Sequence, residues 1–274
     1  MCYAFRDHGC EETMEMHVRG VVGLCRERWE LEGLVTKVSR LIDIGLSRDE
    51  TKRLVKEFII FAAFLHDIGK CDRRYQEVCS RGVCTSFPEH DLLSARFALT
   101  VAFNTGIIEG EFAGRVMKEK LHRMFAKGEM PSDVGDLYLI LVVVPIMFHH
   151  YAQKRSYGYQ KRGRVFRESV RSISMPSGRF EIYEGCIEPM RKVLRELYTV
   201  ETTNYIQKLL REVENMVMHG AELSVIDEKI YGGEYSWSFA KYLAEAVIGL
   251  LNMCDGRVAV MNRRTCRETE SITI

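Results

Sequence analysis

The sequence lacks long apolar runs, a signal-peptide pattern and any sizeable net charge. Its longest apolar stretch, LYLILVVVPIMF at 137–148, is well short of the roughly 20 residues that a helix needs to span a bilayer. No positively charged start followed by an apolar run marks a signal peptide. We therefore expect no membrane segment. The net charge of +1 gives no global attraction to nucleic acid, so any basic surface must be local.

Paired cysteine motifs and a nucleotide phosphate-binding loop are also missing. The nine cysteines are odd in number and scattered, and none stands in C-x-x-C spacing. This pattern is unlike a secreted disulfide framework and predicts a protein of the reducing cytoplasm. The Gly69-Lys70 pair lacks the G-x-x-x-x-G-K-[ST] spacing, so any ATP-driven step must come from another chain.

Glycine and proline are sparse, and alternating apolar and polar runs are rare. Apolar residues recur instead at spacings of three and four, which is the helical period. The sequence therefore predicts an all-α fold as a single domain over 1–274, in which only 178–185 could hold a short hairpin-like piece. The tetrapeptide SRDE at 47–50 resembles a capping box at a helix start. The expected helices cover about 15–29, 50–67, 89–104, 111–126, 134–148, 187–199, 203–219 and 242–255.

One segment, at about 152–180, breaks the helical pattern. Its apolar period weakens, and Glu168 is the one acid among many cations. Aromatic rings are interleaved with these cations, which is the mixture that single-stranded nucleic acid uses, with cations for phosphates and flat rings for bases. We expect either a basic loop that binds nucleic acid or a solvated surface loop. The cations assigned to nucleic-acid binding are Lys154, Arg155, Lys161, Arg162, Arg164 and Arg167.

Histidines and aspartates lie at the ends or on the inner faces of apolar helices. In the stretch FIIFAAFLHDIGK, eight apolar residues at 58–65 lead directly into His66 and Asp67. A second apolar helix ends in the His149-His150 pair. The candidate metal ligands selected by this placement are His17, His66, Asp67, His90, His149, His150 and Asp255.

Each candidate also has a structural interpretation. His17 could be a hydrogen-bonded core residue, and Asp255 before Gly256 could belong to a helix-end turn. Lys70 could interact with the dipole at the end of its helix. Taken together, however, an adjacent His-Asp pair and an adjacent His-His pair after apolar runs are hard to explain by packing alone.

The residue types indicate a transition-metal site. An unpartnered buried carboxylate is costly, so these groups should pair with one another or with metal. Imidazole and carboxylate suit first-row transition metals, and a carboxylate that bridges two ions gives a binuclear site. Such a site binds phosphate and activates water, so the set predicts phosphoester hydrolysis.

The order of these residues resembles the HD superfamily of metal-dependent phosphohydrolases. The motifs are His17, then HDIGK at 66–70, then His90, then HH at 149–150, then Asp255. More narrowly, the chain resembles the separate HD-domain nuclease subunit of type I CRISPR interference systems. The resemblance implies an HD-domain helical bundle with a metal site between core helices, acting in antiviral defence.

The resemblance also implies a role for each matching residue. One ion would be held by His17, His66, Asp67 and Asp255. The second would be held by Asp67, His90, His149 and His150, with Asp67 as the bridge. Catalysis would rest on Asp67 and on Lys70, which would steady the scissile phosphate or its leaving group. The sequence departs from the family at Tyr151, where a glycine often follows the histidine pair.

The implied cofactors are two divalent ions, and Mn, Ni, Co, Fe and Mg all remain open, because the ligand types do not separate them. The implied partners are single-stranded DNA, a separate CRISPR-associated helicase subunit and an RNA-guided surveillance complex. Two alternatives remain: an HD phosphohydrolase for nucleotides or cyclic dinucleotides, and a catalytically silent HD scaffold. Cleavage of RNA and the mode of cutting, endonucleolytic or exonucleolytic, are also open.

Overall fold

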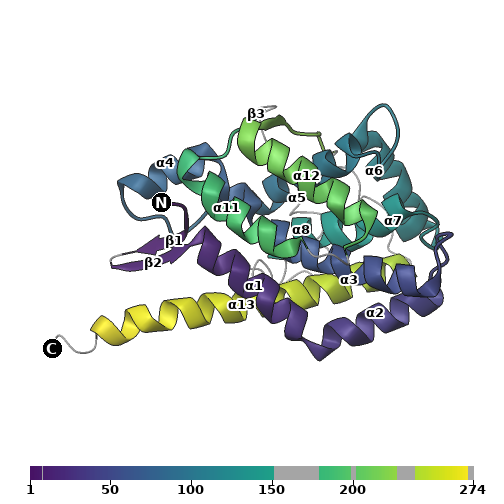
Figure 1. The fold of residues 1–274 in the computed structure, drawn as a ribbon, viewed down its shortest axis with the longest axis horizontal. Helices are drawn as coiled ribbons and strands as arrows, with labels where there is room; N and C mark the ends of the chain where they lie inside the picture. Colours follow the sequence, from purple (N-terminus) through teal and green to yellow (C-terminus); the bar gives the residue numbers. More distant parts are fainter. Residues whose placement is uncertain (8, 151–178, 199–201, 227–237, 271–274) are drawn as a thin grey trace, which may run out of the picture.

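Helix α3 (Arg48–Leu65) lies in the middle of a mainly helical structure (Figure 1). The computed structural model describes residues 1–7, 9–150, 179–198, 202–226 and 238–270. Over these residues the all-α prediction is confirmed in its general form. Helix α3 packs against α1, α2, α8 and α12, and every residue from Phe58 to Leu65 is buried. A helical stretch that is apolar on all sides must be enclosed by other elements, which explains why the second half of α3 is buried.

Most helices form where the sequence predicts them. The helices in the first half of the chain are α1 (Met14–Glu27), α2 (Trp29–Leu41), α3, the short 3-10 helix η1 (Ile68–Cys71), α4 (Arg73–Arg81) and α5 (His90–Asn104). They are followed by α6 (Ala113–Leu121), η2 (His122–Ala126), α7 (Val134–Tyr138), η3 (Leu139–Val143), α8 (Val144–Phe148), α11 (Glu184–Leu197), α12 (Asn204–His219) and α13 (Phe239–Glu270).

The predicted start of α3 is confirmed by its capping contacts. The Ser47 hydroxyl accepts from the Glu50 amide at 3.3 Å, and the Glu50 carboxylate accepts from the Ser47 amide at 3.0 Å. Both contacts satisfy amide groups that a helix start otherwise leaves without partners. The capping box therefore determines where the buried central helix begins.

Two helices and one long extension were not predicted. Helix α2 buries Leu31, Val35 and Val38 at helical spacing, but this stripe is narrow and interrupted by charges. Helix α4 buries only Gln76 and Cys79, so its sequence carries almost no apolar period. Helix α13 runs well past the predicted end, and Figure 1 shows its C-terminal part projecting beyond the β1–β2 hairpin.

Short strands form where the sequence offered no alternating run. Strands β1 (Tyr3–Asp7) and β2 (Cys10–Thr13) pair antiparallel. The prediction of a hairpin-like piece within 178–185 is wrong, because β3 (Arg179–Phe180) pairs with the distant β4 (Ala221–Glu222). The chain enters α11 directly after residue 183, so no second strand can form there.

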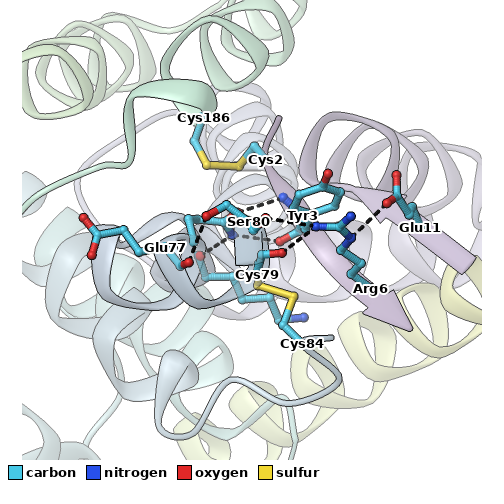
Figure 2. Close-up of a disulfide and its surroundings, with 11 residues drawn as sticks. Cys2, Tyr3, Arg6, Glu11, Glu77, Cys79, Ser80, Cys84 and Cys186 are labelled. Carbon is cyan, nitrogen blue, oxygen red and sulfur yellow. Dashed lines mark hydrogen bonds and ion pairs between the residues drawn. A yellow bond between two sulfur atoms is a disulfide. The ribbon is translucent and has the colours of Figure 1, made fainter. Parts of the chain in front are cut away.

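Among the described residues, two disulfides join four cysteines, and Cys10 is disulfide-bonded as well. Figure 2 shows Cys2 bonded to Cys186 and Cys79 bonded to Cys84. The scattered spacing in the sequence did not reveal these pairs, because the partners of the first are brought together only by the fold. The disulfides argue against the prediction, made from the cysteine spacing, that the protein belongs to a reducing environment. Among the described helices, none combines the length and apolarity needed to cross a membrane.

Candidate metal centre

The ends of three buried helices lie close together in the core. His66 and Asp67 directly follow α3, His90 begins α5, and His149 and His150 directly follow α8. Helix α1 adds His17, and α13, which packs against α1, adds Asp255. The structure thus brings all seven candidate ligands together. They form two groups that share Asp67: His17, His66, Asp67 and Asp255, and Asp67, His90, His149 and His150.

Backbone contacts orient three of the histidine rings. The Nδ1 atom of each ring lies within hydrogen-bond distance of the carbonyl three residues earlier. Because a carbonyl can only accept, Nδ1 carries the proton and Nε2 keeps its lone pair. In metal sites, the ring nitrogen that does not bind the metal usually donates such a hydrogen bond, and this bond orients the imidazole. The three contacts are His66 with Ala63 at 2.8 Å, His90 with Phe87 at 2.5 Å and His149 with Ile146 at 2.6 Å.

The two carboxylate oxygens of Asp67 face different histidines. Oδ2 lies 3.1 Å from Nε2 of His17 and 3.4 Å from Nε2 of His66. Oδ1 lies 3.0 Å from Nε2 of His90 and 3.5 Å from Nε2 of His149. This is the arrangement that a bridging carboxylate needs, with one oxygen for each group of ligands.

The buried polar atoms of the centre fit a metal ion. Two ligand atoms that each lie about 2.1 Å from one ion, with a right angle between the two bonds, are about 3 Å apart. The distances between the Asp67 oxygens and the histidine Nε2 atoms are close to this value. In the described part of the chain, five buried side-chain polar atoms have no hydrogen-bond partner, and all belong to this set. They are Nε2 of His17, His66 and His149, Oδ1 of Asp67 and Nδ1 of His150. Unpartnered buried polar atoms are costly, and a bound cation would satisfy them.

The electrostatics favour the ligand forms of two key groups. Burial raises the pKa of Asp67, but Lys70 and His66 outweigh it and hold that pKa well below its usual range. Burial, aided by His149 and His90, lowers the pKa of His150 to about 2. Asp67 is therefore ionised and His150 neutral at physiological pH, as metal coordination requires.

His17 behaves differently in the metal-free protein. Burial lowers its pKa, but the carboxylates of Asp255, Asp67 and Glu12 raise it well above the usual value. The ring is then protonated near neutral pH. A metal ion bound through Nε2 must displace that proton.

A cavity of about 420 Å³ opens beside the centre. Its lining includes His90, His150 and Asp255 from the centre, together with the cations Lys70 and Arg263. The Lys70 ammonium is buried and lies 2.6 Å from Oδ2 of Asp67. Lys70 therefore contacts both the Asp67 carboxylate and the space that a substrate could enter.

A larger cavity of about 730 Å³ lies between α2, α3 and α12. None of the seven candidate ligands lines it, and its described lining mixes acids and bases such as Glu32, Lys56 and Glu57. Its size alone does not mark it as a functional site.

The glycine of the HDIGK motif permits a close approach of two backbones. A Cβ atom on Gly69 would lie 2.3 Å from the carbonyl oxygen of His90 and 3.0 Å from Oγ of Ser94. The Gly69 amide donates to Ser94 Oγ at 2.9 Å. This contact holds η1, which follows Asp67, against the start of α5, which carries His90.

Glu12 contacts a candidate ligand, and the sequence reasoning missed it. It is fully buried on β2 and accepts a hydrogen bond from Nδ1 of His17 at 2.7 Å. It also accepts from Asn262 at 2.8 Å and from Arg263 at 3.0 Å, both on α13. Glu12 thus orients His17 and ties its helix to the helix of Asp255. No sequence signal marked it, because its role depends on contacts with residues 250 positions away.

We predict that Glu12→Gln weakens metal binding by about 10- to 100-fold, the usual effect of losing a partner behind a ligating histidine. Isothermal titration with Mn²⁺ measures this change. The matched control is Glu196→Gln, which removes an exposed carboxylate from the ion pair with Arg19 and should leave the affinity unchanged. Equal affinities for wild type and Glu12→Gln would show that His17 is not oriented through Glu12.

The predicted nucleic-acid-binding cations lie outside the described residues. These are Lys154, Arg155, Lys161, Arg162, Arg164 and Arg167. At the far end of the basic segment, Arg179 is described, and it donates to the carbonyl of His219 at 2.8 Å.

Comparison with known proteins adds no relative. No protein-family model matches the sequence, and no curated protein matches it either.

Proposed function

We propose that this chain is a metal-dependent phosphodiesterase that cleaves single-stranded DNA. The observation that carries the proposal is the placement of Asp67, whose two oxygens face separate pairs of buried histidines. Nothing in ordinary core packing requires five histidines and two aspartates in this arrangement. Two divalent cations sharing one carboxylate are the simplest occupants.

Each side chain has a role in the proposal. Asp67 would bridge the two ions, and the histidines would hold them with Nε2 or, for His150, with either ring nitrogen. The bound cations would neutralise phosphate charge and lower the pKa of an attacking water. Lys70, at the wall of the cavity, would neutralise a non-bridging phosphate oxygen or the leaving oxygen. The surrounding buried helices limit the access of bulk water to the centre.

Two features support a polymeric substrate. The basic, aromatic segment at about 152–180 begins two residues after His150 in the sequence, so its first cations follow a candidate ligand closely along the chain. Lys70 and Arg263 line the described cavity and place two cationic side chains where a phosphate could approach. Cations with interleaved rings suit single-stranded nucleic acid.

The motif order supports a place in CRISPR antiviral defence. In this proposal a separate helicase subunit, recruited to an RNA-guided surveillance complex, exposes the DNA strand that this chain cuts. The absence of a phosphate-binding loop in the sequence accords with that division of labour.

The experiment that tests the proposal is cleavage of circular single-stranded DNA by the purified chain with Mn²⁺ or Ni²⁺ and with chelator. Metal-dependent opening of the circle is the expected result. Hydrolysis of nucleotides or cyclic dinucleotides without cutting of the circle would favour the small-substrate phosphohydrolase. Metal binding without hydrolysis of any of these substrates, even with a helicase partner present, would favour a scaffold.

A second prediction concerns the number of ions. His17→Ala removes a ligand from one group only, and His149→Ala removes a ligand from the other. Each variant is expected to bind one Mn²⁺ ion fewer than the wild type, as counted by electron paramagnetic resonance and elemental analysis. A wild type that binds a single ion, lost in both variants, would contradict the binuclear assignment and leave a mononuclear centre.

A further inference from the structure

Three buried cysteines lie together at a second point, where Cys71 directly follows Lys70 in the sequence. Cys2 precedes β1, Cys71 ends η1, and Cys186 lies in the first turn of α11. All three are almost fully buried, and their sulfur atoms lie within 4.8 Å of one another. Cys2 and Cys186 form the disulfide seen in Figure 2. The thiol of Cys71 lies 3.8 Å from Sγ of Cys2.

We propose that in the reduced protein Cys2, Cys71 and Cys186 form a second metal site, for a thiophilic cation of the Zn²⁺ or Cu⁺ kind. Zinc–sulfur bonds of about 2.3 Å in a tetrahedron place the sulfurs about 3.8 Å apart. The Cys2–Cys71 separation already has this value. Opening the disulfide would free the side chains of Cys2 and Cys186 to rotate toward this separation, from sulfur positions that already lie within 4.8 Å of one another.

The chemistry of the group selects a soft cation. It contains sulfur ligands and no imidazole or carboxylate, whereas the Asp67 centre contains no sulfur. Thiolates prefer Cu⁺ and Zn²⁺, while the harder ions suit oxygen and nitrogen ligands. The two sites on this chain therefore take different metals.

The proton and electron balance of the site is simple. A dithiol or phosphine reductant supplies two electrons, and two protons convert the disulfide to two thiols. Binding of the cation then releases the thiol protons. Burial raises the pKa of the Cys71 thiol, so without a cation this sulfur stays protonated and inert.

Occupation of the site would fasten three segments under the metal centre. Cys71 directly follows Lys70, and its carbonyl accepts from the Tyr183 amide at 2.8 Å. The Gln76 side chain donates to the carbonyls of Lys70 and Tyr3 at 2.7 and 2.8 Å. A cation held by the three sulfurs would join the N-terminal strand, η1 and α11, as the disulfide joins two of these segments in the oxidised protein.

The test is a Cd²⁺ titration of the reduced chain, followed by the ultraviolet charge-transfer band of thiolate bound to cadmium. The protein is kept in a phosphine reductant, and a thiol count under denaturing conditions verifies that all nine cysteines are free. The band is expected to saturate at one equivalent and to be absent from the oxidised protein. Zn²⁺ should remove it by competition and raise the midpoint of thermal unfolding.

Two variants locate the band. Cys71→Ser should abolish it, and Cys25→Ser, which changes a buried free cysteine elsewhere, should leave it intact. Asp67→Asn should also leave the band intact. The test of the cysteine site is therefore independent of whether the Asp67 centre binds metal or hydrolyses phosphodiesters. Absence of the band from the reduced wild type, or its persistence in Cys71→Ser, would overturn the proposal.

Discussion

Asp67→Ala is expected to reduce metal-dependent hydrolysis to the level of the protein in chelator. Asp67 is the one residue shared by both ligand groups, so its loss removes a ligand from each ion. Loss of a residue that only hydrogen-bonds to a metal ligand lowers metal affinity by up to about 100-fold. Loss of Asp67 itself should lower the affinity for Mn²⁺ by more than this. Cleavage of circular single-stranded DNA and isothermal titration measure the two effects. Retained hydrolysis by the metal-loaded variant would exclude the binuclear centre.

Stability has to be separated from chemistry in this variant. Asp67→Ala leaves the buried Lys70 ammonium without its partner, and breaking a buried ion pair costs about 3–5 kcal/mol of unfolding free energy. Asp67→Asn keeps the size of the side chain and an accepting oxygen, and should lose activity with a smaller loss of stability.

Asp136 offers a matched control for Asp67. It is also fully buried, and its carboxylate pairs with Lys120 at 2.8 Å and Arg123 at 2.6 Å. It belongs to neither candidate ligand group. Asp136→Asn should therefore destabilise the fold and leave the metal-dependent rate per folded molecule unchanged.

Gly69→Ala is expected to disturb the centre without changing any ligand. The new methyl group would overlap the carbonyl oxygen of His90, because the two atoms would lie only 2.3 Å apart. The clashing atom belongs to the backbone and cannot rotate away as a side chain can, so η1 must move away from α5. We expect a loss of about 1–3 kcal/mol of unfolding free energy and weaker Mn²⁺ binding, measured by thermal unfolding and titration.

Gly33→Ala provides the control for this change. Gly33 lies inside α2, and no atom would come within 4 Å of its added Cβ. Alanine is the better helix former, so this variant should be more stable by up to about 1 kcal/mol, with unchanged metal binding. If Gly69→Ala also bound metal normally, the contact between η1 and α5 would not position His90.

The strongest helical signals were read correctly because they lie in the most buried elements. The apolar run at 58–65 became the buried end of α3, and the run at 137–148 became the helical segment that ends at Phe148, just before His149. A helix enclosed on all sides needs apolar residues at every position, and this pattern is visible in the chain itself. The weakly patterned α2 and α4 were missed because they bury narrow faces.

The candidate ligands were found in the same way. A polar group at the end of an apolar run stands out in a sequence, and His66, Asp67, His149 and His150 are all of this kind. Glu12 stands at the end of a short strand among polar residues, so nothing local distinguishes it. Its function arises from hydrogen bonds to His17 and to residues of α13.

The sequence alone thus determined the all-α class, the central buried helices and the residues that meet at the candidate metal centre, because burial and helical period are local properties of the chain. Only the tertiary structure decided which oxygen of Asp67 faces which histidines, why Gly69 must lack a side chain, and that Cys2, Cys71 and Cys186 converge. These features depend on distances between segments that lie far apart along the chain, and such distances exist only once the helices have packed.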